Sequence, residues 1–265
     1  MAVVTLTTEW RADDYYFGIV RGTLERLIPV VSVVVNASSV PALNVAHAAF
    51  VLRNTFHHYP EGSVHLIFVH TEASAKARHL LVKARGHYFI GTDTGIFNLL
   101  LNGEPEMVNQ IGEGSGNDDL ILFAETAAAI IGGTGAGEIG KPADKIRDMV
   151  PLRATIDANA VNGSVIFIDS YGNAITNITR DTFARVFSDK GIVIFIQSNK
   201  HRVDNISTNY NDVPVGDLLA RFNSLDLLEI SINGSNVSEL FRLEAGSVVR
   251  ITSIDDASGG TGLFT

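Results

Sequence analysis

A short polar stretch between two apolar runs carries the side chains with the clearest chemistry in this sequence. Within five residues it contains a carboxylate, an aromatic ring, a glycine and an amide, namely Asp169, Tyr171, Gly172 and Asn173. The amide can donate and accept hydrogen bonds along the edge of a heterocycle, and the carboxylate can pair with a cation. Glycine allows a bend or a close approach of the backbone to a ligand. The same composition is also ordinary hairpin-turn chemistry, so the stretch predicts either a ligand-binding loop or a plain turn.

Further polar side chains lie where predicted strands end. Glu9 follows the first strand, Asp14 falls in the loop or helix turn after it, and His70 ends the third strand. Ligands of open parallel sheets bind outside the carboxyl ends of the strands. Each residue taken alone fits a helix cap or a solvated loop. Taken together with Asp169–Asn173, they favour a polar cleft between domains, which is a common place for a small-ligand site.

The first half of the chain alternates strand and helix patterns. Strands are predicted at Val3–Thr8, Val30–Val35 and Ser63–Val69, and helices at Tyr15–Leu27, Asn44–Tyr59 and Leu120–Ile131. The second of these strands is an almost continuous apolar run, which is typical of a strand buried on both faces. Two shorter strands, His79–Lys83 and His87–Ile90, are joined by an Arg-Gly turn. The alternation predicts an α/β domain with a mainly parallel sheet.

The pattern changes after Ile131. The glycine-rich run Gly132–Gly140 follows a helix and lacks a closing Gly-Lys-Ser/Thr, so we interpret it as an interdomain loop and not a phosphate loop. A boundary near residue 150 divides the chain into residues 1–150 and 151–265. Beyond it strand patterns dominate, and helices are expected only at Arg180–Ser188 and Val215–Phe222. This pattern predicts a C-terminal β-barrel domain.

The composition excludes several classes of site. The 265 residues have a formal net charge of −9, are 46% hydrophobic and 18% charged, and include no cysteine. Disulfides, thiolate metal sites and a cysteine nucleophile are excluded, and a nucleic-acid surface, which needs clustered Lys and Arg, is not expected. No His-x-x-x-His pair or acidic cluster has metal-ligand spacing, so we expect no metal. Without a secretory pattern or an apolar run of ~18–20 residues, we expect a cytoplasmic protein that has no membrane partner.

Short motifs occur in a fixed order along almost the whole chain. They are Thr5–Glu9, Ala48–Arg53, Tyr59–His65, His87–Ile90 with Asp93 and Gly95, Asp169–Asn173 with Thr176–Ile178, Asn209–Gly216, and Leu228–Gly234. In their order and spacing they resemble the S-adenosylmethionine hydroxide adenosyltransferase family, whose relatives include fluorinating and chlorinating enzymes. The resemblance implies an N-terminal α/β domain, a C-terminal β-barrel and a homotrimer. The ligand would lie between the N-terminal domain of one subunit and the C-terminal domain of its neighbour.

The resemblance also implies a reaction. The family displaces methionine from the C5′ carbon of S-adenosylmethionine, and the nucleophile is water, hydroxide or halide. Such an in-line substitution requires a protein that aligns the nucleophile, removes its hydration shell and holds the ribose fixed. No cofactor is implied other than S-adenosylmethionine itself, as substrate or ligand, and no sequence feature indicates a halide pocket.

Some family positions on the ribose and methionine side are matched in this sequence. Glu9 matches a ribose-binding aspartate, and its carboxylate, one methylene longer, can accept both ribose hydroxyls. Asp14 and Asp169 match acidic residues near the methionine amino group, where their charge suits an ammonium. Ser224 aligns with a serine near the methionine carboxylate. These four residues are therefore predicted to bind the ribose and methionine parts of the ligand.

Other matched positions concern the adenine. Tyr171 and Asn173 match an aromatic residue and an amide at the base, one stacking and the other hydrogen-bonding its edge. Tyr210 matches a second adenine-facing aromatic residue, and Asn233 lies in the segment that closes over the base. The resemblance thus predicts that the adenine is bound by residues of the second domain.

The sequence departs from the family around the nucleophile. Members that use hydroxide carry an Asp, an Arg and a His around the water, and the corresponding positions here are His70, Ala77, with Arg78 next to it, and Asp118. One hypothesis is a rewired site, in which His70 and Asp118 form an acid–base pair and Arg78 or Arg11 supplies positive charge.

The departure leaves three functions open. The expected function is hydrolysis of S-adenosylmethionine to adenosine and methionine. The alternative is a non-catalytic binder of S-adenosylmethionine or adenosine with a degenerate nucleophile site. A third is a trimeric interaction module with a vestigial cleft. This third function would be favoured if Asp169 and Asn173 formed hydrogen bonds within the barrel itself.

Overall fold

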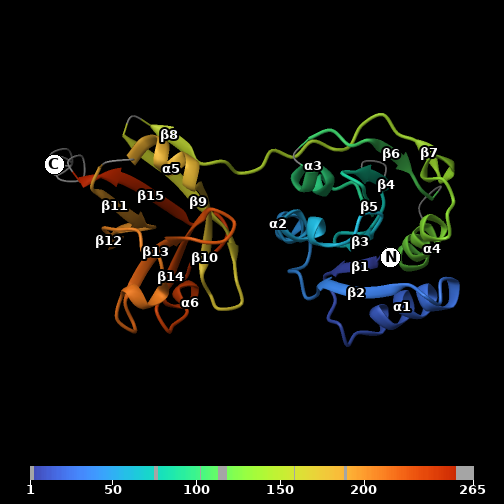
Figure 1. The fold of residues 1–265 in the computed structure, drawn as a ribbon, viewed down its shortest axis with the longest axis horizontal. Coiled ribbons are helices and arrows are strands. Elements are labelled where there is room, and N and C mark those ends of the chain that lie inside the picture. The colour runs from blue at the N-terminus through green and yellow to red at the C-terminus, as the bar shows by residue number, and fades with distance from the viewer. Residues whose placement is uncertain are drawn as a thin grey trace. The chain divides into compact units, whose positions relative to one another are not determined.

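The computed structural model describes residues 3–74, 77–101, 103–112, 118–157, 159–187 and 190–254. The chain divides into two compact units, Met1–Val150 and Pro151–Thr265 (Figure 1). Among the described helices, none is both long enough and apolar enough to cross a membrane.

The first unit is built on a 7-stranded sheet with the strand order β2-β1-β3-β5-β4-β6-β7. The parallel part consists of β2 (Ser32–Ala37), β1 (Val3–Thr8), β3 (Val64–Phe68) and β5 (His87–Thr92). The antiparallel part consists of β4 (His79–Ala84), β6 (Met107–Gln110) and β7 (Lys141–Pro142). The predicted α/β domain with a mainly parallel sheet is confirmed, and the carboxyl ends of its parallel strands share one edge.

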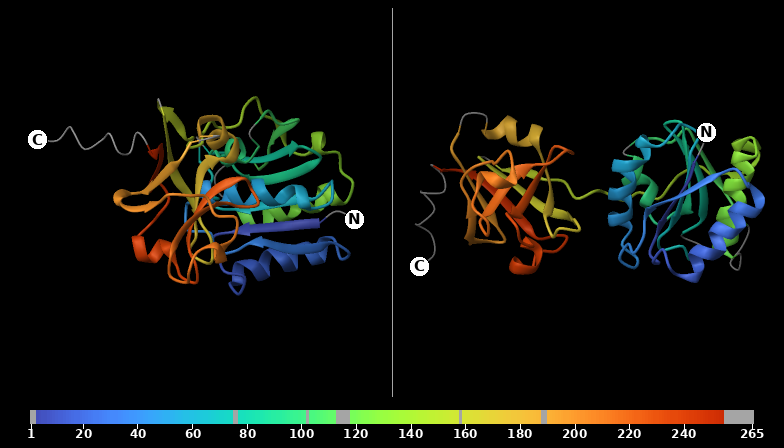
Figure 2. Two further views of the ribbon diagram at one scale, coloured as in Figure 1. Left: turned by 60° about the vertical axis from the view of Figure 1, so that its left-hand side comes forward. Right: turned by 60° about the horizontal axis from the view of Figure 1, so that its bottom comes forward.

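Helices cover both faces of this sheet. On one face, α1 (Tyr15–Leu27) and α4 (Asp119–Ile131) bury Val20, Leu24 and Phe123 against β1 and β3. On the other face, α2 (Val45–Thr55), η1 (Phe56–His58) and α3 (Ile96–Leu101) contribute to a second apolar cluster. Figure 2, right, shows helices on opposite sides of the sheet. The apolar positions of α1 and α2 recur with helical spacing, so each helix buries one apolar stripe and leaves its opposite face in water.

Two expectations for this unit are wrong. The run Val30–Val35 was expected to be buried on both faces, but β2 begins at Ser32, lies at the edge of the sheet and is only partly buried, while Val30 is 84% exposed. An apolar run cannot distinguish an edge strand from a central one. The glycine-rich run Gly132–Gly140 is not an interdomain loop, because it joins α4 to β7 within the first unit. The side chain of Asn109 holds it by donating to the Ala136 and Ile139 carbonyls, at 3.1 and 2.8 Å.

The second unit is a nearly closed antiparallel barrel. Its 8-stranded sheet has the order β12-β11-β15-β9-β10-β14-β13, and β8 pairs with β9. The strands are β8 (Thr155–Asp157), β9 (Ala160–Ile168), β10 (Ala174–Thr179), β11 (Ile192–Ile196), β12 (Ser198–Val203), β13 (Leu218–Phe222), β14 (Leu227–Ile232) and β15 (Val248–Ser253). Ser207, which follows β12, forms a bridge to Arg221 of β13 and so connects the two end strands. The predicted C-terminal barrel is confirmed.

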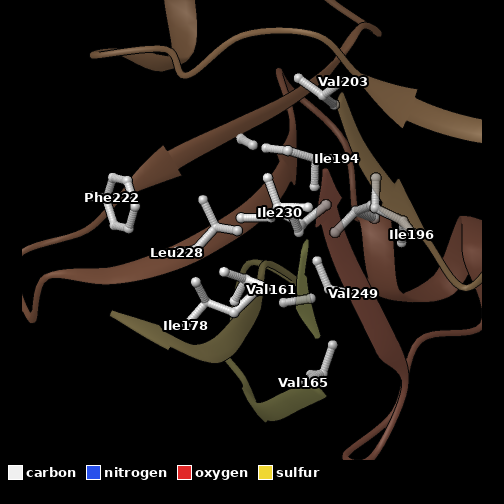
Figure 3. Packing of buried hydrophobic residues seen from close by; sticks show 14 of the residues in the cluster. Val161, Val165, Ile178, Ile194, Ile196, Val203, Phe222, Leu228, Ile230 and Val249 are labelled. Atoms are coloured by element: carbon white, nitrogen blue, oxygen red, sulfur yellow. The ribbon is translucent and has the colours of Figure 1, made fainter. Parts of the chain in front are cut away.

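The interior of the barrel is filled by branched aliphatic side chains. Val161 of β9, Ile194 of β11, and Leu228 and Ile230 of β14 point toward one another (Figure 3). Short helices α5 (Arg180–Phe187), α6 (Val237–Phe241) and η3 (Tyr210–Asp212) accompany the strands. Alternation of buried and half-buried positions along β9 is what a strand with one face on this core requires.

One helix expected in this unit is a strand. The spacing of apolar residues in Val215–Phe222 predicted a helix, but Leu218–Phe222 is β13 and pairs with β14. The segment is too short for a helix to form without tertiary packing, so the pairing decides its conformation. The strand β12 and the helix α6 were not predicted from the sequence.

Candidate functional site

Glu9 links loops that follow the carboxyl ends of the parallel strands. Its Oε1 accepts hydrogen bonds from the backbone N–H groups of Leu43 and His70, at 2.6 and 3.0 Å. Both of these residues have left-handed backbone conformations, with φ of 61° and 51°, which cost energy for residues other than glycine. The carboxylate thus stabilises two strained loops. In the described part of the chain its Oε2 makes no hydrogen bond, and its predicted role, accepting from the ribose hydroxyls, stays a prediction.

Asp14 is the N-cap residue of α1, but its side chain makes no capping hydrogen bond. Aspartate at this position usually accepts a hydrogen bond from the first turn of the helix. The half-buried carboxylate is therefore not used by the helix that it precedes. Its predicted role, binding the methionine ammonium, remains a prediction that this geometry permits.

The rewired acid–base pair expected from the sequence stays a hypothesis that no contact in the described residues supports. Among the residues that the structure describes, no hydrogen bond or ion pair joins His70 to Asp118. Asp118 caps α4 by accepting a hydrogen bond from Leu120 N at 3.0 Å, and it is exposed. His70 is exposed as well, and its backbone N–H is bound to Glu9.

The two arginines proposed to supply charge are bound elsewhere. Arg78 donates from Nη2 to the carbonyl of Lys145 at 2.9 Å, and the same atom lies 4.0 Å from Asp93 Oδ2. Arg11 forms an exposed ion pair with Asp13. Since exposed pairs contribute little to stability, the Arg11 pair can be rearranged more easily than the contacts of Arg78.

Asp93, which directly follows β5, is a buried carboxylate with a structural role. Both of its oxygens accept hydrogen bonds from the backbone N–H of Arg147, at 2.9 and 3.0 Å. Burial raises the pKa of this carboxyl, while the hydrogen bond from Arg147 and the charge of Arg78 oppose the rise. Asp93 and Arg78 together hold the segment around residues 145–147 against the carboxyl edge of the sheet.

A different imidazole–carboxylate pair lies at this edge. His79 Nε2 is 3.2 Å from Asp119 Oδ1 and 2.9 Å from the carbonyl oxygen of Thr71, to which Thr92 Oγ1 also donates at 2.7 Å. The side chain of His79 is 5% exposed and that of Asp119 is 23% exposed. Burial raises the pKa of Asp119, and His79 and a hydrogen bond from the Thr71 side chain oppose the rise. The pair therefore joins β4, the loop after β3 and the first turn of α4.

Sequence reasoning missed this pair by a small margin. Thr71 and Asp119 each follow a residue of the expected pair, and His79 was interpreted only as the start of a strand. His79 faces Thr92 because β4 runs antiparallel to β5, so the first residue of β4 lies at the carboxyl edge. One signal could have identified His79: a strand that runs antiparallel to its neighbour places its amino end, not its carboxyl end, at this edge of the sheet.

In the second unit, the polar stretch 169–173 is a hairpin that closes on itself. Asp169 Oδ1 accepts from the backbone N–H groups of Tyr171 and Asn173, both at 2.9 Å, and Oδ2 accepts from Asn173 Nδ2, also at 2.9 Å. Asn173 is 5% exposed. These are the internal hydrogen bonds that the interaction-module hypothesis expects. Tyr171, by contrast, is 78% exposed and offers its ring to a partner or ligand.

The hairpin lies against the loop that precedes α6. Gly172 has φ of 81°, and its carbonyl accepts from Ser238 N at 3.0 Å. A Cβ at Gly172 would overlap the side-chain amide of Asn236, which caps α6. Close by in sequence, Asn233 donates from Nδ2 to the carbonyl of Val213 at 2.9 Å. The structure thus brings the predicted residues Asp169, Tyr171, Asn173 and Asn233 to one end of the barrel.

Tyr210 is held by a buried polar cluster. Its hydroxyl donates to Glu229 Oε1 at 2.7 Å, and the guanidinium carbon of Arg221 lies 4.7 Å from the ring centroid. Glu229 is 3% exposed and also accepts from Ser231 Oγ at 2.9 Å. Burial raises the pKa of the Tyr210 phenol, and the hydrogen bond to Glu229 adds to the rise. Tyr210 is thereby a fixed, partly exposed ring, as an aromatic stacking surface requires.

Ser224 lies apart from the other predicted residues of this unit. It occupies the exposed turn before β14, whereas Asn233 follows the same strand. At the usual rise of about 3.3 Å per residue, the strand separates the two by about 20 Å. The role predicted for Ser224, near the methionine carboxylate, stays a prediction.

Together, a mainly parallel α/β unit with a polar carboxyl edge and a nearly closed barrel with an aromatic, amide-bearing loop end define a two-domain class of protein. Two family models match this chain. The SAM hydroxide adenosyltransferase N-terminal domain matches residues 4–140, and the SAM hydroxide adenosyltransferase C-terminal domain matches residues 163–250. The chain therefore belongs to the SAM hydroxide adenosyltransferase family, as its motifs indicated.

Curated relatives are similar over nearly their whole length. A protein of Thermus thermophilus named (R)-S-adenosyl-L-methionine hydrolase is 25% identical over 275 residues, which cover 95% of this chain and 100% of the relative. A protein of Methanocaldococcus jannaschii with the same name is 23% identical over 254 residues, which cover 91% of this chain and 92% of the relative.

Solved structures share the fold. An uncharacterized conserved protein of Thermotoga maritima superposes with a TM-score of 0.84 at 20% identity, covering 94% of this chain and 100% of that chain. A conserved hypothetical protein of Thermus thermophilus gives a TM-score of 0.77 at 25% identity, covering 95% of this chain and 100% of that chain.

Proposed function

We propose that this protein hydrolyses S-adenosylmethionine to adenosine and methionine. The observation that carries the proposal is its likeness, over more than nine-tenths of the chain, to relatives named (R)-S-adenosyl-L-methionine hydrolase. The carboxyl edge of the first unit supports it, because Glu9 Oε2 and the Asp14 carboxylate make no hydrogen bond within the described residues and suit ribose hydroxyls and an ammonium. The exposed ring of Tyr171 and the fixed ring of Tyr210 suit the adenine.

The proposed reaction is a substitution at the C5′ carbon. The oxygen of water forms a bond to C5′, the bond from C5′ to the sulfonium breaks with both electrons going to sulfur, and the water loses a proton. Methionine leaves as a neutral thioether, so the positive charge of the substrate disappears as the proton is released. The protein's part is to fix the ribose, align the water opposite sulfur and accept the proton.

Incubation of the purified full-length protein with S-adenosylmethionine tests this proposal. We expect adenosine and methionine in equal amounts, and in ¹⁸O-labelled water we expect the label in the 5′-hydroxyl of adenosine. Separate incubations with the R and S epimers at sulfur ask whether the preference in the relatives' name extends to this chain. No adenosine above a heat-inactivated control would refute hydrolysis, and unlabelled adenosine would refute attack of water at C5′.

A non-catalytic binder of S-adenosylmethionine or adenosine is the second candidate. One observation favours it: the family's nucleophile positions hold His70, Ala77 and Asp118 in this chain. The hydrogen bond between Asp169 and Asn173 favours the interaction module instead. Calorimetric titration with both ligands distinguishes the binder from hydrolysis. Binding without turnover supports the binder, whereas no heat with either ligand would leave the interaction module as the remaining function.

We also propose that the protein assembles as a homotrimer, which the family resemblance implies. Light scattering coupled to size exclusion would then give about three times the 28.5 kDa chain mass. A mass equal to one chain at micromolar concentration would contradict the proposal. Repeating the measurement with adenosine present asks whether ligand binding and assembly are linked.

A further inference from the structure

We propose that Asp119, positioned by His79, is the group that accepts the proton from the water nucleophile, in place of the family's own set around that water. The proposal rests on the proposed hydrolysis of S-adenosylmethionine. It assigns a proton acceptor to the region where the sequence departs most from its family.

The Nε2 atom of His79 carries a hydrogen. A carbonyl oxygen can only accept a hydrogen bond, so the 2.9 Å contact from His79 Nε2 to Thr71 O requires a hydrogen on Nε2. Asp119 Oδ1 lies 3.2 Å from the same nitrogen. A nitrogen that already carries a hydrogen cannot take a proton from the carboxylate, so the effect of His79 on Asp119 is electrostatic. His79 orients Asp119 and stabilises its ionised form, as an orienting partner does for a catalytic base.

The carboxylate of Asp119 is more accessible to water than the imidazole of His79. His79 is almost wholly buried and packs edge-on against Phe123, with the ring centroids 5.1 Å apart. Asp119 is the more exposed partner, so a water molecule can reach its carboxylate and not the imidazole. Asp119 is also the first residue of α4, and the backbone of that first turn is bound by Asp118 and not by Asp119. Its carboxylate is thus directed to the edge of the sheet instead of capping its own helix.

Charged and polar groups surround the carboxylate of Asp119. The groups that face Asp119 are His79 from β4, Thr71 and Glu72 from the loop after β3, and Asp118 from the start of α4. Burial raises the pKa of Asp119 most, and the two acidic neighbours, Glu72 and Asp118, add to the rise. A carboxylate with a raised pKa is a better proton acceptor at neutral pH than an ordinary one. The proton released when water attacks C5′ therefore has an acceptor at the carboxyl edge of the sheet.

The variants Asp119→Asn and His79→Gln test the proposal in the full-length protein, with Glu125→Gln, an exposed change on the same helix, as the control. For Asp119→Asn we expect kcat to fall at least about 100-fold, with an unchanged Kd for S-adenosylmethionine. For His79→Gln we expect the acidic limb of the kcat/KM–pH profile to move to higher pH, because an interaction that lowers the pKa of Asp119 is lost. A change that only loosened the structure would not move this limb.

Several outcomes would overturn the proposal. Full rate in Asp119→Asn would do so alone, as would an unmoved acidic limb in His79→Gln. Asp118→Asn keeps a good helix cap, so an equal loss of rate in that variant would assign the proton to Asp118 instead. Absence of turnover in the unmodified protein would refute the proposed hydrolysis, and the inference with it. Circular dichroism and the binding titration identify any variant that fails to fold. If either Asp119→Asn or His79→Gln fails to fold, the result of the other variant tests the proposal.

Discussion

Replacement of Gly172 by alanine is expected to lower the free energy of unfolding of the second unit by about 3 kcal/mol. The residue has φ of 81°, which L-residues rarely adopt. A Cβ there would also overlap the side chain of Asn236, whose Oδ1 accepts from Glu239 N at 3.0 Å and caps α6. The substitution therefore strains the hairpin and displaces a helix cap at once. It also changes the presentation of Tyr171, so weaker binding of adenosine should accompany the loss.

Gly216→Ala is the matched control for this prediction. Gly216 has φ of 93°, but nothing lies within 4 Å of the position that its Cβ would take. The same substitution should thus cost only the conformational term, about 1 kcal/mol. Equal losses in the two variants would show that the contact with Asn236 contributes nothing.

Hydrogen exchange measured by mass spectrometry on the full chain is the appropriate readout for both glycine variants. The sole tryptophan, Trp10, lies in the first unit, so its fluorescence does not report on the barrel. Faster exchange in peptides from β9, β10 and α6 is expected for Gly172→Ala, with unchanged exchange in the first unit.

Local pattern was sufficient for most elements of the fold, and it was insufficient where pairing decides conformation. The helix Tyr15–Leu27 has the predicted bounds because its apolar stripe and the proline after it are local signals. The strand Leu218–Phe222 was not predicted, because five residues with apolar positions at several spacings fit either structure until β14 pairs with them. The edge position of β2 is likewise a property of the whole sheet and not of its own residues.

For the candidate site, residue types identified the regions but not the individual contacts. The stretch 169–173 was selected for its carboxylate, ring and amide, yet the sequence could not show that Asp169 and Asn173 bond to each other. At the carboxyl edge, the expected partners were His70 and Asp118. The residues that contact His79 are Thr71 and Asp119, each one position later in the chain. Such differences depend on register and helix phase, which long-range packing fixes.

Lowering the pH from about 7.5 to about 5 is expected to destabilise the first unit through His65. This residue is fully buried in β3, with Nδ1 2.8 Å from Thr5 Oγ1 and Nε2 3.2 Å from His87 Nδ1. Burial, and secondarily the neighbouring His87, lower the pKa of His65 from 6.5 to about 3. Burial is also the main cause that lowers the pKa of His87. Burial therefore holds His65 neutral in the folded protein and favours the neutral form of His87.

The direction of the pH effect follows from which state binds the proton. Below pH 6.5 the unfolded chain protonates His65, and the folded chain does so only near pH 3. The stability that neutral His65 contributes above pH 6.5 is therefore lost progressively as the pH falls toward about 3. For one such group the loss is about 2 kcal/mol by pH 5 and at most about 5 kcal/mol near pH 3. Most carboxylates stay ionised down to about pH 5, so this interval separates the histidine from general acid unfolding.

Urea unfolding followed by Trp10 fluorescence measures this loss, because Trp10 packs on Phe68, at the end of the strand that contains His65. The variant His65→Gln removes the titrating group, and the same change at the exposed His58 is the control. Absolute stability will fall in His65→Gln, but the informative quantity is the difference in free energy of unfolding between the two pH values. That difference should be about 2 kcal/mol smaller in His65→Gln than in the unmodified protein or in His58→Gln. Parallel pH dependence in all three proteins would mean that His65 is protonated in the folded state as readily as in the unfolded chain. The pair with His87 would then have to accommodate a charge, which the burial of both rings argues against.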